Sequence, residues 1–230
     1  KLFTLMGVLF VPLGNGLIYT AYTYTTAING GVVSASQPAI TVLLTWLMFR
    51  DVINWKQGIG IVIAGLGVLV IITQGAPLTI LVMDFNKGDL IMLAAIAFAA
   101  LYNVLIRKVP EQIPVPQLMV IVLVSGAVMT LPLYILETIH IGPVPVNLVT
   151  IASILWVGIA VTAIAVGLMS VAIRRIGANK ASMSNYMRAL FTALLAVVLL
   201  GEDFQTFHLV AMVLVIGGVF LMTRGRKSAN

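Results

Sequence analysis

Eight long apolar runs divide this chain, and they limit its fold more than any other feature of the sequence. A helix needs roughly 20 apolar residues to cross a bilayer core of about 30 Å, whereas a barrel strand needs only about 10 residues of alternating polarity. Run length therefore predicts an all-α polytopic membrane protein with eight transmembrane helices. The predicted spans are Leu2–Tyr24, Thr26–Phe49, Lys56–Thr73, Gly88–Ile106, Gln117–Leu136, Leu148–Ile173, Ala178–Leu200 and Phe207–Thr223.

Composition indicates that lipid surrounds the chain. Apolar residues make up 61% and charged residues 9% of the sequence, whereas a soluble domain carries about 25% charged residues. The net charge of +6 comes from short basic clusters between the spans, which is typical of membrane topology and not of a nucleic-acid interface. We therefore expect the lipid bilayer as a partner and no nucleic acid. Cysteine is absent, and no hydrolase, P-loop or metalloprotease motif is present, so we expect no enzyme, metal or cofactor.

The basic residues fall almost entirely on one side of the predicted membrane. Eleven fall on one side, one falls on the other, and Arg188 lies inside a span. The positive-inside rule makes the side with eleven cytoplasmic. The sequence therefore predicts a multi-pass protein of the cell membrane, the inner membrane of a bacterium, with both termini cytoplasmic. The eleven are Lys1, Arg50, Lys56, Arg107, Lys108, Arg174, Arg175, Lys180, Arg224, Arg226 and Lys227, and the one is Lys87.

An internal repeat relates the first spans to the last spans by an offset of 151 residues. Asp51 matches Glu202 and Gly67-Val68 matches Gly218-Val219, without gaps across three helices. We interpret residues 1–75 as the last three helices of a first five-helix repeat, 76–87 as a loop, and 88–230 as a complete second repeat. Two helices before Lys1 would then give ten in all. Five is odd, so the halves would be inverted, an architecture that places transport sites at the repeat interface.

The order and spacing of several short motifs resemble the drug/metabolite transporter superfamily in its EamA-like ten-helix form. The resemblance covers nearly the whole chain, and it implies alternating-access transport of small metabolites, often export of amino acids or related compounds. It also implies a central cavity lined by the first, second, fourth, sixth and seventh spans. Its ninth helix usually carries a proline where this chain has Ala189. The motifs are Ser36-Gln37-Pro38-Ala39-Ile40 with Asp51, Gly58, Gly65-Leu66-Gly67-Val68, Gly88-Asp89-Leu90, Ile176-Gly177-Ala178, Gly201-Glu202 and Gly217-Gly218-Val219.

Polar residues at helical spacing mark the candidate substrate site. The offset of 151 pairs the two stripes residue by residue, and steps of three and four place each stripe on one helix face. Polar groups in hydrocarbon need partners or water, so both faces are expected to point inward. The alternative for the smaller residues is hydrogen bonding across a dry helix interface. The stripes are Ser34, Gln37 and Thr41 in the second span, and Asn185, Arg188 and Thr192 in the seventh.

Arg188 is the strongest single candidate for substrate binding. We expect it to be the only charged residue inside a span, and we expect no carboxylate to lie inside a span. An arginine at the middle of a membrane helix costs about 2.5–3.5 kcal/mol on insertion scales, so it is not expected to face lipid. Its guanidinium suits a carboxylate or phosphate, with Gln37 facing it across the cavity. The alternative is a structural arginine that caps free carbonyls. Asn15 and Tyr19 of the first span are expected to add an aromatic and polar wall, the alternative being a tyrosine at the membrane boundary.

Gly30, Gly31 and Pro38 weaken the second span. Proline removes a backbone hydrogen bond and clashes with the preceding turn, so a helix broken here is a candidate hinge. The alternative is a static kink.

The sequence thus favours a secondary transporter that exports or exchanges small metabolites such as amino acids. The alternatives are a nucleotide-sugar or other organic-anion antiporter, and a membrane subunit that does not transport. A membrane-embedded enzyme would need a nucleophile, metal set or acid pair at membrane depth, and none is evident. A small-molecule substrate and a homodimer are the remaining partners that the sequence allows.

Overall fold

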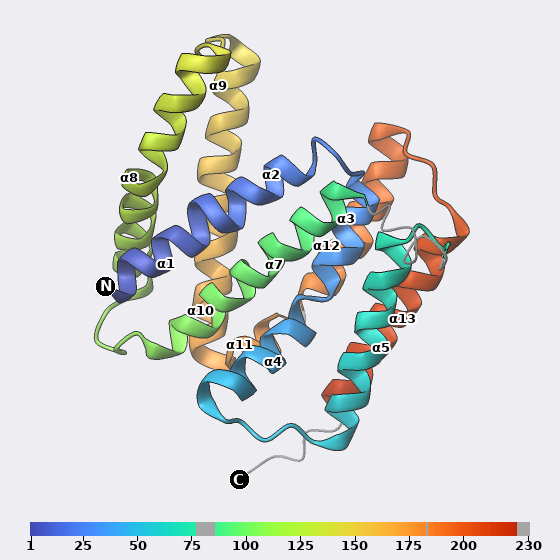
Figure 1. Ribbon diagram of the computed structural model, residues 1–230. Helices are drawn as coiled ribbons and strands as arrows, with labels where there is room; N and C mark the ends of the chain where they lie inside the picture. The colour runs from blue at the N-terminus through green and yellow to red at the C-terminus, as the bar shows by residue number, and fades with distance from the viewer. Residues whose placement is uncertain (77–85, 183, 225–230) are drawn as a thin grey trace.

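The computed structural model describes residues 1–76, 86–182 and 184–224, and these residues form helices joined by short turns (Figure 1). Several of the predicted spans consist of two or three helical segments instead of one continuous α-helix. In chain order the elements are α1 (Leu2–Phe10), a π-helical segment (Val11–Gly16) and α2 (Leu17–Ala21); α3 (Ala27–Ala35) and α4 (Gln37–Phe49); α5 (Trp55–Ile72); α7 (Lys87–Leu105) with a 3-10 turn (Ile106–Lys108); α8 (Val115–Ile141); α9 (Leu148–Leu155), a π-helical segment (Trp156–Val166) and α10 (Gly167–Ile176); α11 (Ala178–Ala181), α12 (Ser184–Leu195) and a π-helical segment (Ala196–Leu200); and α13 (Thr206–Arg224).

These helices confirm the predicted fold class, an all-α polytopic membrane protein. Within the described residues, six helices are long and apolar enough to cross a membrane, and two shorter apolar helices, Met187–Leu200 and Thr206–Met222, follow them. Each of the eight coincides with one predicted span. The predicted loop at 76–87 falls mostly outside the described residues.

Glycines set the closest helix pair, α5 against α13. A side chain at Gly218 would lie 2.6 Å from the backbone nitrogen of Ala64 and from the oxygen of Gly60, while one at Gly67 would lie 2.8 Å from the oxygen of Ala211. Small residues let membrane helices approach closely, and packing then stabilises the pair. The contacts are reciprocal under the offset of 151: Gly60 meets Gly218, and their mates Ala211 and Gly67 meet in turn.

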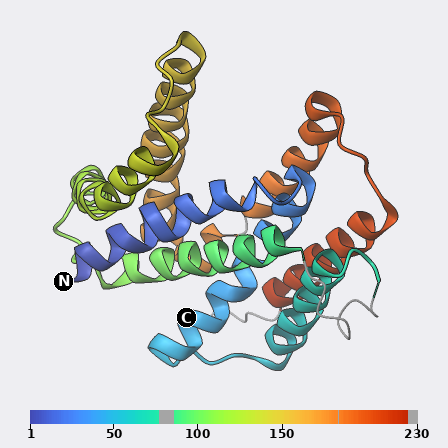
Figure 2. The same ribbon diagram turned by 45° about the horizontal axis from the view of Figure 1, so that its top comes forward.

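The helices α8 and α9 form a hairpin that projects from the rest (Figures 1 and 2). It is joined to the remainder where α8 crosses α1, with Gly7 and Gly126 at the crossing. No part of the most apolar stretch of Leu148–Ile176 is buried within the chain. Apolar side chains exposed over this length are suited to lipid.

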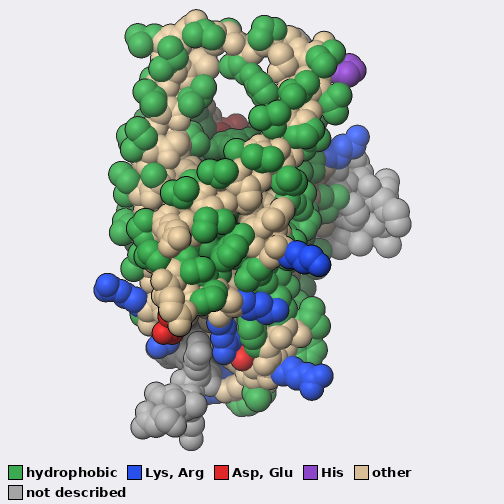
Figure 3. Space-filling model, turned by 90° about the vertical axis from the view of Figure 1, so that its left-hand side faces the viewer, with side chains coloured by type: hydrophobic (Ala, Val, Ile, Leu, Met, Phe, Trp, Pro, Cys, Tyr) green, Lys and Arg blue, Asp and Glu red, His purple; other side chains and the backbone are tan. Residues whose placement is uncertain are grey.

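Basic side chains gather at one end of the molecule. Figure 3 shows a largely hydrophobic face with most of its Lys and Arg toward the lower end. Arg107, Arg174 and Arg175 line one cavity there, and we call this end the basic end. The start of α3 lies at the opposite end (Figure 1). The charge pattern predicts that the basic end is cytoplasmic.

Candidate functional site

The polar stripe of the second span is buried. Ser34 is 6%, Gln37 5% and Thr41 0% exposed, and Asn185 of the seventh span is 6% exposed. The amide nitrogen Nδ2 of Asn185 donates to Oε1 of Gln37 over 2.8 Å. The structure therefore brings two predicted site residues, from spans 148 residues apart, into direct contact inside the protein.

Arg188 follows Asn185 by one helical turn, and its side chain is exposed in the described chain. It makes no hydrogen bond or ion pair with any described residue, although Tyr22 lies within electrostatic range of it. The structure gives Gln37 the partner Asn185. The substrate-binding role of Arg188 stays a prediction.

The first-span candidates lie apart from the Gln37–Asn185 pair. Asn15 is half-buried in the π-helical segment, and Tyr19 is 53% exposed in α2. Neither forms a hydrogen bond to Gln37 or Asn185. Tyr22 packs against α3, because its hydroxyl lies 3.0 Å from where a side chain at Gly30 would begin. The substrate-binding roles of Asn15 and Tyr19 stay predictions.

The second span is interrupted at Ser36, immediately before Gln37 and Pro38. Pro38 occupies the first turn of α4, the helical position that tolerates a missing N–H group. Gly30 and Gly31 lie inside α3, where Tyr22 and Thr192 respectively come close. The interruption was predicted, whereas the hinge roles of Pro38, Gly30 and Gly31 stay predictions.

The seventh span breaks at a different place from the second. The helix α11 ends at Ala181 and α12 begins at Ser184, whereas the mate of Ser36 would be Met187. The missing proline at Ala189, which is buried in α12, agrees with this shift.

The expectation that no carboxylate lies inside a span, and that Arg188 is the only charge there, is wrong. Asp89 lies in the first turn of α7 and is 0% exposed. It accepts hydrogen bonds from the hydroxyl of Thr25 and from Nδ2 of Asn29, at 3.2 Å for its Oδ2. Such donors compensate for the water that a buried carboxylate loses. A side chain at Gly88 would lie 2.7 Å from the nitrogen of Thr25, so Gly88 permits this approach.

The same network continues to His208, which is buried in the first turn of α13. Its Nδ1 accepts from the N–H of Gln205 over 2.9 Å. Nε2 therefore carries the proton of the neutral ring and donates to Oδ1 of Asn29 over 3.0 Å. Sequence patterns gave no sign of this chain of contacts, because its members come from three different helices.

Glu202 makes the remaining contact at this end. Its two carboxylate oxygens accept from the backbone N–H groups of Ala27, over 2.7 Å, and Ile28, over 2.9 Å. The start of a helix leaves such N–H groups free, and a negative charge there is favourable. Glu202 thus joins the segment before α13 to the start of α3.

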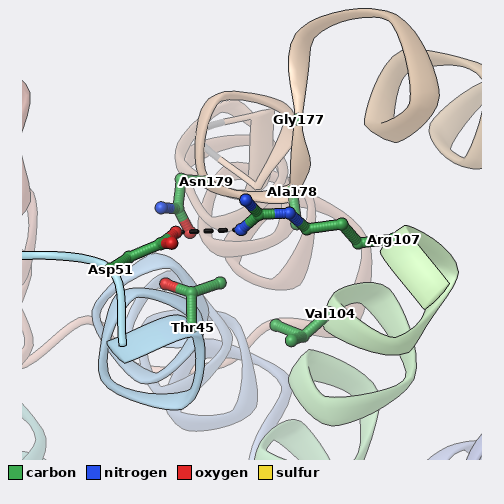
Figure 4. A pocket seen from close by; sticks show the side chains of 7 residues that line it. All are labelled: Thr45, Asp51, Val104, Arg107, Gly177, Ala178 and Asn179. Carbon is green, nitrogen blue, oxygen red and sulfur yellow. Dashed lines mark hydrogen bonds and ion pairs between the residues drawn. The ribbon is translucent and has the colours of Figure 1, made fainter. Parts of the chain in front are cut away.

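At the basic end, Oδ2 of Asp51 pairs with Nη1 of Arg107 over 2.9 Å. The guanidinium carbon also lies 4.6 Å from the centre of the Phe49 ring. Asp51 and Arg107 line a cavity of about 250 Å³ together with Ala178 and Asn179 (Figure 4). No cluster of three His, Asp or Glu side chains suited to a metal occurs in the described part of the chain.

Comparison with known proteins identifies the family. The EamA-like transporter family matches residues 1–73 and 86–224. The chain belongs to the EamA-like transporter family. This confirms the resemblance to the drug/metabolite transporter superfamily.

Relatives of this EamA-like transporter are bacterial and archaeal. An uncharacterized transporter of Bacillus subtilis, YyaM, is 28% identical over 94% of this chain and 71% of its own length. An uncharacterized transporter of Methanothermobacter thermautotrophicus is 26% identical over 95% of this chain, and the chain spans 62% of that relative's length. A probable amino-acid metabolite efflux pump of Salmonella typhimurium is 24% identical over 84% of this chain and 66% of its own length.

The fold of this EamA-like transporter also has a solved counterpart. One crystal structure matches with a TM-score of 0.60 and 19% identity, over 97% of this chain and 85% of the other. Identity this low supports the shared fold alone.

Proposed function

We propose that the protein containing this chain is a secondary transporter that exports or exchanges small metabolites, such as amino acids or related compounds, by alternating access. The buried Gln37–Asn185 hydrogen bond carries the proposal, since it joins the second and seventh spans, both of them interrupted, inside the protein. Interrupted helices meeting at a repeat interface are typical of transporter sites. The relative named as a probable amino-acid metabolite efflux pump supports this substrate class.

The proposed anchor for the substrate is the guanidinium of Arg188. Under the offset of 151, the reciprocal of the Gln37–Asn185 contact is a contact between Ser34 and Arg188. Neither side chain has a hydrogen-bond partner among the described residues. We place a substrate carboxylate between them, with two N–H groups of Arg188 and the hydroxyl of Ser34 as donors.

Transport is tested with the full-length protein in proteoliposomes. A panel of radiolabelled amino acids, other carboxylates and nucleotide sugars is loaded inside, and efflux is measured with and without unlabelled substrate outside. We expect saturable efflux of at least one amino acid or related carboxylate, and its loss in Arg188→Ala. Efflux of nucleotide sugars alone, or no efflux of any compound above protein-free liposomes, would contradict the proposal.

A further inference from the structure

Five side-chain contacts hold together the end of the molecule that lies opposite the basic end. Glu202 holds the N–H groups of Ala27 and Ile28, and Asp89 holds Thr25 and Asn29. His208 adds a contact from α13 to Asn29, at the same turn of α3. The start of α3 is therefore fixed to both α7 and α13 at this end.

The repeat relates this closed end to the basic end. Adding 151 to Ala27 and Ile28 gives Ala178 and Asn179, while Asp51 is the mate of Glu202. The backbone before each acid also matches, because Arg50 has φ 56° and its mate Gly201 has φ 66°. Both acids thus follow their helices through the same left-handed turn.

The contacts of the two acids differ, although their surroundings correspond. Asp51 pairs with Arg107 and makes no bond to Ala178 or Asn179. Asp51, Ala178 and Asn179 line one cavity of about 250 Å³ (Figure 4). Oδ1 of Asn179 is buried there without a partner.

The ion pair between Asp51 and Arg107 can be replaced by other contacts of Asp51 at little cost in stability. The side chains of Arg107 and Asp51 are 55% and 38% exposed, and ion pairs this exposed contribute little stability. The Glu202 carboxylate, in contrast, is half-buried and accepts two short hydrogen bonds. Direct hydrogen bonds therefore hold the end with Glu202 together, whereas a cavity remains beside the acid at the end with Asp51.

We propose that Glu202 and Asp51 are alternating gate residues, each of which closes one end of the transporter by binding the start of a span in the opposite repeat. In the state observed, Glu202 holds α3. In the opposite state, Glu202 releases Ala27 and Ile28, and Asp51 leaves Arg107 to accept from the N–H groups of Ala178 and Asn179. Arg107 stabilises the open basic end by occupying Asp51. This inference rests on the proposed alternating-access transport.

The test measures which end is open, and it needs no substrate. The described chain has no cysteine, so a single Ser34→Cys reporter at the buried site is added to a full-length protein without other cysteines. A membrane-impermeant maleimide is applied to oriented vesicles, from the Glu202 side and from the basic side separately. The ratio of the two labelling rates reports the ratio of the two open states.

Each of the three gate variants has an expected direction of change in the labelling ratio. Glu202→Gln should raise the ratio of Glu202-side to basic-side labelling about tenfold, because a neutral amide replaces a charged, doubly bonded acceptor. Asp51→Asn should lower the ratio. Arg107→Gln lies on the surface and should raise it, because Asp51 is then free for Ala178 and Asn179. The last variant keeps the test informative if Glu202→Gln does not fold.

Two exposed acids serve as matched controls. Asp203 is adjacent to Glu202, and Glu111 lies at the basic end, so Asp203→Asn and Glu111→Gln should leave the ratio within twofold of the parent. If Glu202→Gln and Asp51→Asn move the ratio in the same direction, or if Arg107→Gln leaves it unchanged, the gate proposal is overturned. Transport without these shifts refutes the gates alone, whereas the shifts without transport of any compound refute the proposed function alone.

Discussion

The packing of α5 on α13 predicts that two adjacent glycines respond in opposite ways to the same substitution. A Cβ at Gly218 would lie 2.6 Å from the nitrogen of Ala64 and from the oxygen of Gly60, and 3.1 Å from Cβ of Ile63. At Gly217 nothing lies within 4 Å. Gly218→Ala must therefore displace a neighbouring backbone, whereas Gly217→Ala adds a methyl group in open space.

The expected cost follows from these distances. The contact at 2.6 Å must lengthen by about 0.8 Å to reach 3.4 Å, where ordinary contacts begin. Two of the opposing atoms belong to the backbone of α5, so the helices must separate along the contact. Overpacking of this kind costs about 1–3 kcal/mol, and the better helix propensity of alanine offsets up to about 1 kcal/mol. We expect Gly218→Ala to lower the free energy of unfolding by about 1–2 kcal/mol.

Unfolding by added SDS in mixed micelles, followed by tryptophan fluorescence, measures this difference. Gly67→Ala should behave as Gly218→Ala does, with a smaller loss where Val215 can rotate away. Gly65→Ala has nothing within 4 Å and should match Gly217→Ala, with no loss or a gain of up to about 1 kcal/mol. If Gly218→Ala is as stable as Gly217→Ala, the close approach of α5 and α13 is not the source of stability inferred here.

Three further substitutions test the backbone at Arg50, the Gln37–Asn185 hydrogen bond and the role of Pro38. Arg50→Gly should stabilise the protein by about 1 kcal/mol in the same unfolding assay, because φ 56° is costly for any residue with a side chain; an unchanged or lower stability would contradict this. Asn185→Ala should cost about 1–3 kcal/mol, since it leaves Oε1 of Gln37 buried without a donor, and a double-mutant cycle with Gln37→Ala that shows no coupling would refute the contact. Pro38→Ala should lower maximal flux more than substrate affinity in proteoliposomes, because a restored N–H group extends α4 toward Ser36, and unchanged flux would leave Pro38 as a static kink.

Sequence patterns predicted the features that depend on one helix at a time. Run length located the spans, and the spacing of Ser34, Gln37 and Thr41 placed all three on a face that the structure buries. Pro38 predicted an interruption within the second span, and the structure has it at Ser36. Each of these features follows from local geometry and from the cost of polar groups in lipid, so one stretch of sequence is enough.

The features that sequence missed depend on how helices meet. Gln37 pairs with Asn185 because the rotation of α12 is set by its packing on α3, where Gly31 faces Thr192. Asp89 escaped notice because a carboxylate near the start of a span resembles an ordinary surface acid. Asp89 can be buried only because Gly88 has no side chain, which lets the backbone at Thr25 come close. The one available signal was the motif Gly88-Asp89 itself, a glycine and an acid at the beginning of an apolar run.

Binding of one carboxylate substrate and of its carboxamide analogue, to the full-length protein and to Arg188→Ala, shows whether Arg188 recognises the charge of the substrate. The comparison isolates the charge of the ligand, since the two ligands have nearly the same size. If Arg188 anchors the carboxylate, wild type binds the carboxylate at least about tenfold more tightly than the carboxamide, and Arg188→Ala loses this preference. Equal binding of the two ligands by wild type, or an undiminished preference in Arg188→Ala, would contradict the claim that Arg188 binds an anionic substrate.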